Sequence, residues 1–232
     1  MKKINFLVIS LLLLVFTSCK DDSGEYERTY HTDTQLAEAI KLCLEISVDT
    51  ANSHLAVEDG FYAYNDAMYR IALPASANVL VEVLEDNDEV ELLDTLILRM
   101  NKAAEISGDY IRNNFRSVIA ASTFPDPDKL LRDSIPSLTN YLRDTKTFVL
   151  TNALNNAVGN NLSRTGAITA WNEAMEIYQQ HATQVLSIDF TENVTRQLVD
   201  GIMKEMAIEE EFIRTDTTHQ HTTFLKEVFR NY

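Results

Sequence analysis

The sequence predicts an all-α fold, a single multi-helix domain built around one long helix at about residues 88–122. Three observations support this class. Only 6 Gly and 4 Pro occur in 232 residues, and turn-rich β folds depend on these two residue types. Hydrophobic residues make up 45% of the chain, which is enough to form a core. Apolar positions recur every three or four residues along most of the chain, which is the periodicity of a helix.

Residues 1–18 are predicted to form a signal peptide rather than part of the fold. Lys2 and Lys3 precede an apolar run over 4–16, which is shorter than the roughly 20 residues that a membrane-spanning helix needs. The run leads into Phe16-Thr17-Ser18-Cys19, which resembles a lipobox. We therefore expect Cys19 to be lipidated and to attach the protein to a membrane. The alternative is an ordinary secretory signal followed by an incidental cysteine.

Residues 19–32 are predicted to be a flexible tether, because this polar segment lacks helical periodicity. Its start, Cys19-Lys20-Asp21-Asp22, resembles lipoproteins that one Gram-negative lineage exports to the cell surface. An ordinary acidic tether is the alternative. We expect the protein in the outer membrane of a Gram-negative bacterium, on its periplasmic or its outer face. The tether would lead to an all-helical domain over residues 33–232.

The first elements of this domain are predicted from one stripe and two turn signals. Apolar residues over 36–55 form a helical stripe, with Thr32 or Asp33 as the cap. The pair Asp59-Gly60 predicts a turn. Asn65 can then cap a short helix that ends before Pro74, because proline disfavours a helical residue before it.

The middle of the chain is predicted to contain the longest helix. A helix over about 75–87 comes first, and the segment over 88–122 then keeps near-heptad apolar spacing without a proline. Gly108 is the one weak point of that long helix. Asp126-Pro127 predicts an N-cap followed by proline at the first helical position.

Four more helices are predicted in the C-terminal part. Two of them, over 137–160 and 164–184, lie on either side of a Gly- and Asn-rich turn at 159–161. Thr191 is expected to cap a helix that runs to Arg214, and a short last helix carries the apolar residues of 224–229. The apolar pieces 79–83 and 185–190 are too few for a credible sheet.

The acidic balance of the chain disfavours one class of partner. The formal charge is −15, which repels phosphate backbones, so nucleic acid is not expected to bind. Cys43 is the only cysteine besides Cys19, and no basic residue near it would activate the thiol, so a buried, unreactive cysteine is expected. No cofactor is expected, because the sequence contains no phosphate loop, dinucleotide fingerprint or familiar catalytic motif.

Carboxylates beside the apolar stripes are the first candidates for chemistry. Glu209 and Glu210 continue the stripe of the last long helix, so at least one should face the edge of the core and need a partner. Arg214 follows Glu210 by four residues, which favours an ion pair. The alternative is a carboxylate placed for metal binding or proton transfer.

Two further pairs have suggestive spacing. Asn101 and Glu105 lie one turn apart beside the stripe of the long helix, where polar groups usually fix the register between helices. A catalytic dyad is the alternative. His219 and His221 would point to one side of an extended chain and would then be weak candidates for a shared metal ion. A solvated pair in a polar loop is the favoured interpretation.

Short motifs occur in a fixed order from about residue 36 to 229. They are Asp59-Gly60-Phe61-Tyr62, Ile71-Ala72-Leu73-Pro74, Asn101-Lys102-Ala103-Ala104-Glu105, Tyr141-Leu142-Arg143-Asp144-Thr145, Leu198-Val199-Asp200-Gly201-Ile202, Glu209-Glu210-x-x-Ile213-Arg214 and Phe224-Leu225-Lys226-Glu227-Val228-Phe229. In these motifs the chain resembles the bacterial family named domain of unknown function 4197, whose members are secreted or lipid-anchored. The family commonly has Ala-Ala-Arg-Thr where this chain has His219-Gln220-His221-Thr222.

The resemblance implies a helical fold and an envelope location, but no activity. The polar residues of its motifs agree with the candidates above and would define a site if they converged in one cleft. The candidate residues are Asp59, Tyr62, Asn101, Glu105, Arg143, Thr145, Asp200, Glu209, Glu210 and Arg214. The favoured function is a non-catalytic, lipid-anchored module that binds an envelope protein or peptide. The alternative is a carboxylate-based metal-binding protein or hydrolase.

Overall fold

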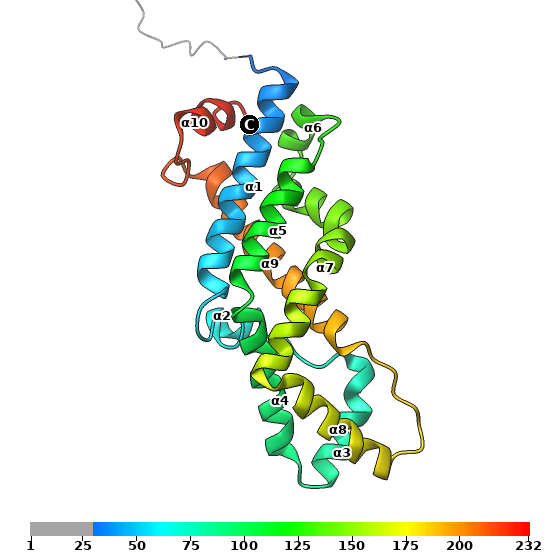
Figure 1. The fold of residues 1–232 in the computed structure, drawn as a ribbon. Coiled ribbons are helices and arrows are strands. Elements are labelled where there is room, and N and C mark those ends of the chain that lie inside the picture. The colour runs from blue at the N-terminus through cyan, green and yellow to red at the C-terminus, as the bar shows by residue number, and fades with distance from the viewer. Residues whose placement is uncertain (1–29) are drawn as a thin grey trace, which may run out of the picture.

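The computed structural model describes residues 30–232, and this part of the chain consists of helices and their connections (Figure 1). The expected signal peptide over 1–18, Cys19 and most of the tether lie outside the described residues. Within residues 30–232 the chain forms one domain with ten α-helices and one short 3-10 helix, which confirms the all-α class. No helix in this range combines the length and the apolar character that crossing a membrane requires.

Helix α1 (Asp33–Leu55) begins at the predicted cap. The Thr32 hydroxyl accepts the backbone N–H of Gln35, and the Gln35 side chain accepts the backbone N–H of Thr32. The apolar stripe over 36–55 is buried, as its spacing predicts. The thiol of Cys43 lies fully buried on this stripe.

The expected cap at Asn65 is wrong, because the short helical segment α2 (Tyr64–Ala67) begins one residue earlier and has Ala63 at its N-cap. The segment is a single left-handed turn, in which Asn65, Asp66 and Ala67 all have positive φ. The ring of Tyr64 stacks on that of Tyr69 with 5.9 Å between centroids. Aromatic packing across the turn therefore accompanies a backbone conformation that non-glycine residues rarely adopt.

The next boundaries agree with the sequence. After Pro74 the chain enters a 3-10 turn, η1 (Ala75–Ala77), and then helix α3 (Asn78–Asp86). Helix α6 (Pro127–Arg132) starts with the predicted cap, in which the Asp126 carboxylate accepts the backbone N–H of Lys129 at 3.0 Å.

The expected long helix over 88–122 is wrong, because it is two helices, α4 (Val90–Glu105) and α5 (Gly108–Ala121). The break falls at Ile106 and Ser107, where the Asn161 amide donates to the Ser107 hydroxyl at 3.0 Å. Gly108 allows close approach to the end of α1, because a Cβ there would lie 2.5 Å from the Cβ of Ala56. Contacts with α1 and α7 thus stabilise a break that periodicity alone does not reveal.

The expected turn at 159–161 is also wrong. It lies inside helix α7 (Ser137–Thr165), and the chain turns instead at Gly166, whose φ is +78°, before helix α8 (Ala167–His181). Asn161 is buried and bonded to Ser107 and Arg164, so tertiary partners outweigh its weak helix propensity.

Helix α9 (Phe190–Thr215) takes the central place that was expected for 88–122. It packs against both α1 and α7 and also contacts α4 (Figure 1). Its cap is Asp189 rather than Thr191, since the Asp189 carboxylate accepts the backbone N–H of Glu192 at 2.9 Å. The chain closes with helix α10 (Thr223–Phe229), capped by Thr222.

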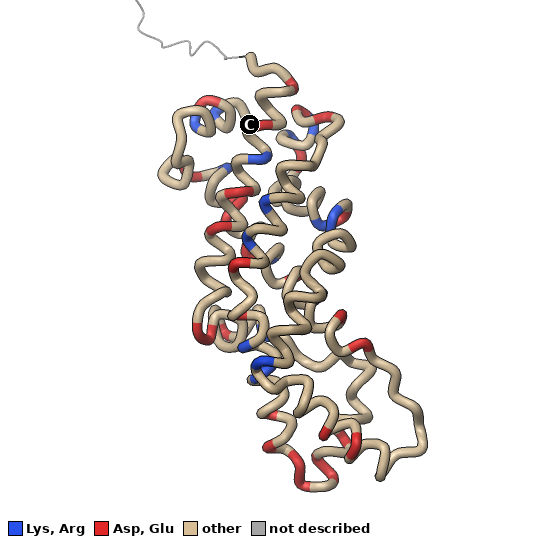
Figure 2. Tube along the Cα trace, in the orientation of Figure 1, with Lys and Arg blue, Asp and Glu red and all other residues tan. Residues whose placement is uncertain are grey.

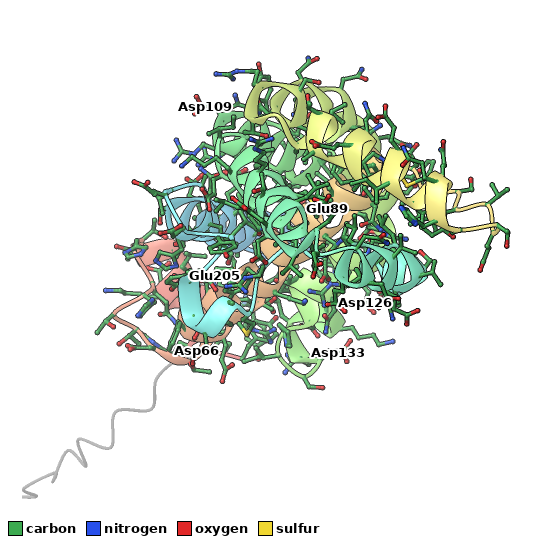
Figure 3. All side chains as sticks on the ribbon, turned by 90° about the horizontal axis from the view of Figure 1, so that it is seen from below. Asp66, Glu89, Asp109, Asp126, Asp133 and Glu205 are labelled. Carbon is green, nitrogen blue, oxygen red and sulfur yellow. The ribbon has the colours of Figure 1, made fainter. Side chains whose placement is uncertain are left out.

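Acidic residues are spread along the whole domain rather than gathered on one face (Figure 2). Figure 3 labels examples on several helices and loops, among them Asp66, Asp109 and Asp133. Most acidic side chains of residues 30–232 are exposed, and the buried carboxylates in this range are Glu105, Glu205, Glu209 and Glu210. The negative charge is therefore a general surface property, and these four are the carboxylates that need an explanation.

Candidate functional site

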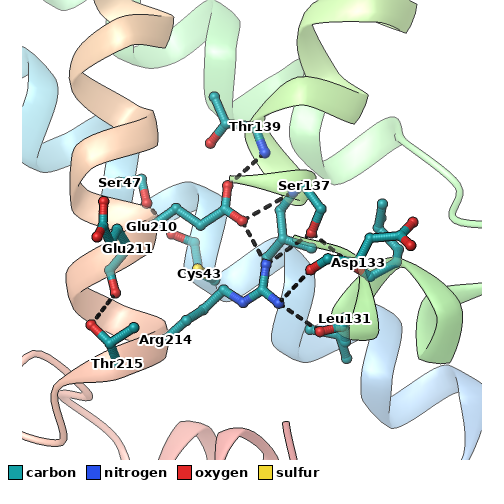
Figure 4. A network of polar contacts seen from close by, with 12 residues as sticks. Cys43, Ser47, Leu131, Asp133, Ser137, Thr139, Glu210, Glu211, Arg214 and Thr215 are labelled. Atoms are coloured by element: carbon teal, nitrogen blue, oxygen red, sulfur yellow. Dashed lines mark hydrogen bonds and ion pairs between the residues drawn. The ribbon is translucent and has the colours of Figure 1, made fainter. Parts of the chain in front are cut away.

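Glu210 is the most buried of the predicted carboxylates, with none of its surface exposed (Figure 4). It accepts the backbone N–H groups of Leu138 at 3.0 Å and Thr139 at 2.7 Å. These are donors of the first turn of α7, which has no side-chain cap of its own. Glu210 therefore caps α7 from another helix and places a negative charge at its positive end.

Arg214 completes this network. Its guanidinium lies 2.9 Å from Glu210, donates to the Ser137 hydroxyl at 2.8 Å and also donates to the carbonyl of Leu131. The side chain is only 4% exposed. Burial, followed by the charge of Glu210, raises the pKa of the nearby Cys43 thiol well above its usual range. These groups satisfy one another, and the thiol stays protonated and unreactive.

Glu209 and the two C-terminal histidines form no larger cluster. His219 Nδ1 lies 3.3 Å from Glu209, and the imidazole stacks on Phe212 with 4.9 Å between centroids. His221 is exposed. Over residues 30–232, histidine, cysteine and acidic side chains nowhere gather in threes that could hold a metal ion.

Arg143 and Asp200 come together in a groove between α7 and α9, together with Arg196 and Gln197. Asp200 is already paired with Lys204 at 2.9 Å. Thr145 does not line this groove; it is exposed, and its hydroxyl donates to the carbonyl of Tyr141 within its own helix.

The remaining candidates surround a different pocket. Asp59 and Glu105 line a pocket of about 320 Å³, and Glu58 joins them from the loop after α1. The lining from α4 contains two bases, Arg99 and Lys102. Leu98 and Thr165 complete it.

Asn101 and Tyr62 position this pocket without lining it. The Asn101 amide accepts the backbone N–H of Ile71 and donates to the carbonyl of Ile71, both at 2.8 Å. This pins the segment before Pro74 against α4, one turn before Glu105. The backbone of Tyr62 acts to lower the pKa of the Glu105 carboxyl, and the Tyr62 ring is covered by the Arg70 guanidinium at 4.3 Å.

Glu105 is the unusual group of the pocket. It is 5% exposed, and its Oε2 lies 3.4 Å from Lys102, but its Oε1 is buried without a hydrogen-bond partner among residues 30–232. Burial raises the pKa of the Glu105 carboxyl, against the lowering effect of Lys102 and of the Tyr62 backbone. Arg99 is engaged with the carbonyl of Gly166 at 3.3 Å. The pocket therefore offers an unused hydrogen-bond acceptor, the Oε1 of Glu105.

A third cluster escaped the sequence analysis. Glu205 of α9 lies 2.6 Å from His54 of α1, and it also accepts the hydroxyl of Tyr69 (Glu205 is labelled in Figure 3). Burial, together with this contact to Glu205, raises the pKa of Tyr69. One signal was available, because Glu205 precedes Glu209 by one helical turn and lies on the same buried face. The cluster joins the turn after α1 to the central helix.

A model of the family described as protein of unknown function (DUF4197) matches residues 30–230. No curated protein and no solved structure matches the chain. The family match thus covers almost all of the described chain and assigns no activity to it.

Proposed function

We propose that this chain, which belongs to the DUF4197 family of proteins of unknown function, is a non-catalytic, lipid-anchored binding module of the bacterial envelope. The ligand proposed for the Glu105 pocket is the free amino group at the end of a peptide. One observation carries this choice, the buried Glu105 Oε1 that has no partner in a pocket whose bases are already engaged.

The charges of the pocket favour a cationic group. Glu58, Asp59 and Glu105 contribute three carboxylates against the two bases Arg99 and Lys102. Both bases have partners, whereas neither Glu58 nor Asp59 forms an ion pair with a described residue. A protonated amine would donate to Glu105 Oε1 and stabilise its charged form. Leu98, which is 49% exposed, offers apolar contact to the adjoining side chain.

The distribution of the other candidates favours binding over catalysis. A carboxylate-based metal protein or hydrolase would need several of them in one cleft. In residues 30–232 they lie instead in separate places, at the start of α7, beside His219, in the α7–α9 groove and around Glu105. Glu210 at the start of α7 is already paired with Arg214, and Glu209 already contacts His219.

The lipid anchor is tested by following Cys19. In cells, wild-type protein is expected to incorporate labelled palmitate and to partition into the detergent-rich phase. Cys19→Ala should abolish labelling, because the thiol is the acylated group. Cys43→Ala is the matched control and should leave labelling unchanged. Labelling that persists in Cys19→Ala would contradict the anchor.

The pocket is tested with peptides whose amino termini are free or acetylated. We expect the detergent-solubilised protein to bind a subset of free peptides and to bind their acetylated forms at least about tenfold more weakly, the loss of one charged hydrogen bond. Glu105→Gln should weaken free peptides to a similar extent. Glu211→Gln, an exposed change on α9, is the control. Equal binding of free and acetylated peptides would contradict the proposal.

A further inference from the structure

The groove between α7 and α9 is a second feature, and the proposed function does not use it. It has a volume of about 320 Å³ and contains Arg143, Thr147, Arg196, Gln197, Asp200 and Met203. Arg143 belongs to α7 and Arg196 to α9, so the two helices each bring one guanidinium to the same groove.

Neither guanidinium forms an ion pair with a described residue. Arg143 Nη1 donates to the side-chain amide oxygen of Asn140 at 3.3 Å, and Arg143 Nε is buried without a hydrogen-bond partner in the described part of the chain. Arg196 is exposed. Asp200, the carboxylate among the lining residues, is paired with Lys204.

Arginines of the described chain have partners of different kinds. Arg70, Arg99 and Arg164 donate to carbonyl or amide oxygens. Acidic residues outnumber basic ones by 35 to 20, so an arginine has many carboxylates to pair with. Arg116, Arg132 and Arg214 each do so at 2.9 Å. A buried donor without a partner is costly, and an oxygen of a ligand would satisfy it. This groove therefore offers an unused hydrogen-bond donor, whereas the Glu105 pocket offers an unused acceptor.

The groove also continues beyond the arginines. Arg196 lines a neighbouring pocket of about 230 Å³, where Ser76, Ser187 and Asn193 add hydroxyl and amide groups. The lining also contains the carboxylates Asp189 and Glu192, so the phosphate itself is placed on the Arg143 side of Arg196. This second space gives room for the polar remainder of a ligand whose charged end lies between the arginines.

We propose that the α7–α9 groove binds a phosphate monoester, with Arg143 and Arg196 as the groups that neutralise it. The planar guanidinium fork matches phosphate oxygens, and two unpaired arginines match a dianion, whereas one would suffice for a carboxylate. A long polyanion is disfavoured by the overall charge of −15. The phosphate belongs either to a free small molecule or to a lipid headgroup, because both present the same chemistry.

The experiment titrates the detergent-solubilised protein with three probes in calorimetry. These are glycerol phosphate, a soluble short-chain phosphatidic acid and a short-chain phosphatidylcholine as the zwitterionic comparison. The variants are Arg143→Lys, which keeps the charge but loses the fork, and Arg196→Gln at an exposed position that carries little risk to folding. Arg116→Gln, which removes a guanidinium paired with Asp49, is the matched control.

Binding of either phosphate probe, weakened about tenfold in Arg196→Gln and Arg143→Lys but not in Arg116→Gln, supports the proposal. Preference for glycerol phosphate would assign a free ligand, and preference for phosphatidic acid over phosphatidylcholine would assign a headgroup. The absence of binding to both phosphate probes would overturn it. So would an equal loss in Arg116→Gln, because the attraction would then be diffuse.

Discussion

Glu210→Gln tests whether the buried carboxylate of α9 is a structural charge. The change keeps the size of the side chain and removes its charge. Arg214, with a side chain only 4% exposed, would lose its counter-ion. The amide would also present N–H groups where two oxygens now accept the backbone donors of Leu138 and Thr139. At least one of those buried donors would then lack an acceptor.

The expected cost follows from these contacts. Breaking a buried ion pair by removing one partner costs about 3–5 kcal/mol, because the remaining charge stays buried. Arg214 keeps its bonds to Ser137 and Leu131, which places the loss toward the lower end of that range. A domain of ordinary stability has about 5–15 kcal/mol in total, so the variant should fold with a much reduced margin.

The assay is urea denaturation followed by helical circular dichroism. Asp200→Asn is the control, since it breaks an exposed pair with Lys204 and should cost no more than about 1 kcal/mol. The double variant Glu210→Gln/Arg214→Met should lose less than the sum of its single changes, because neither charge is then left alone. A loss below about 1 kcal/mol in Glu210→Gln would refute the structural role.

Three further outcomes are expected. Asn101→Leu leaves the buried N–H and C=O of Ile71 without partners and should lower the free energy of unfolding by about 2–4 kcal/mol in urea denaturation; a neutral effect would contradict its positioning role. Thr32→Ala removes a capping box and should cost about 1 kcal/mol, with Thr32→Ser as the control in the same assay. Burial raises the pKa of Glu105 in the folded state, so the folded protein retains a proton that the unfolded chain has released. The contribution of Glu105 to stability should therefore fall as the pH rises from 4.5, the ordinary pKa of a glutamate, through the raised pKa of Glu105 in the folded state. Glu105→Gln should flatten this part of the pH profile of stability, measured by chemical denaturation.

Local signals were sufficient where the residues that fix a boundary are neighbours in sequence. Thr32 and Asp126 cap their helices through backbone donors three residues away, and Pro74 ends one segment just before the next begins. These boundaries depend on short-range geometry, so a single sequence contains what is needed to predict them.

The errors occur where a distant element decides. The break at Ser107 is held by Asn161, which lies 54 residues further along the chain. The same bond keeps Asn161 inside a helix, although Asn and Gly around it predict a turn. One tertiary contact thus overturned two local predictions, and helical periodicity carries no trace of it.

The candidate sites show the same division. The placing of Glu210 at the core edge and its pairing with Arg214 follow from helical spacing, and the structure confirms both. The two backbone donors from α7 do not follow, because they lie more than 70 residues away. Arg196 and His54 belong to no recognisable motif, and only the packing of α9 against its neighbours brings them into the groove and the Glu205 cluster.

Two of the four buried glutamates of residues 30–232, Glu210 and Glu105, differ in how completely the surrounding residues satisfy their oxygens. Both face the core edge, and both have a basic partner on their own helix. Both carboxylate oxygens of Glu210 accept hydrogen bonds. One oxygen of Glu105 has no partner among the described residues, and the pKa of Glu105 is raised. Neutralising Glu210 therefore removes stability, while Glu105→Gln removes a desolvation cost and should leave the protein at least as stable at neutral pH. Unchanged stability in Glu105→Gln is therefore the result that the proposed ligand role predicts, and a loss of stability as large as that of Glu210→Gln would contradict it.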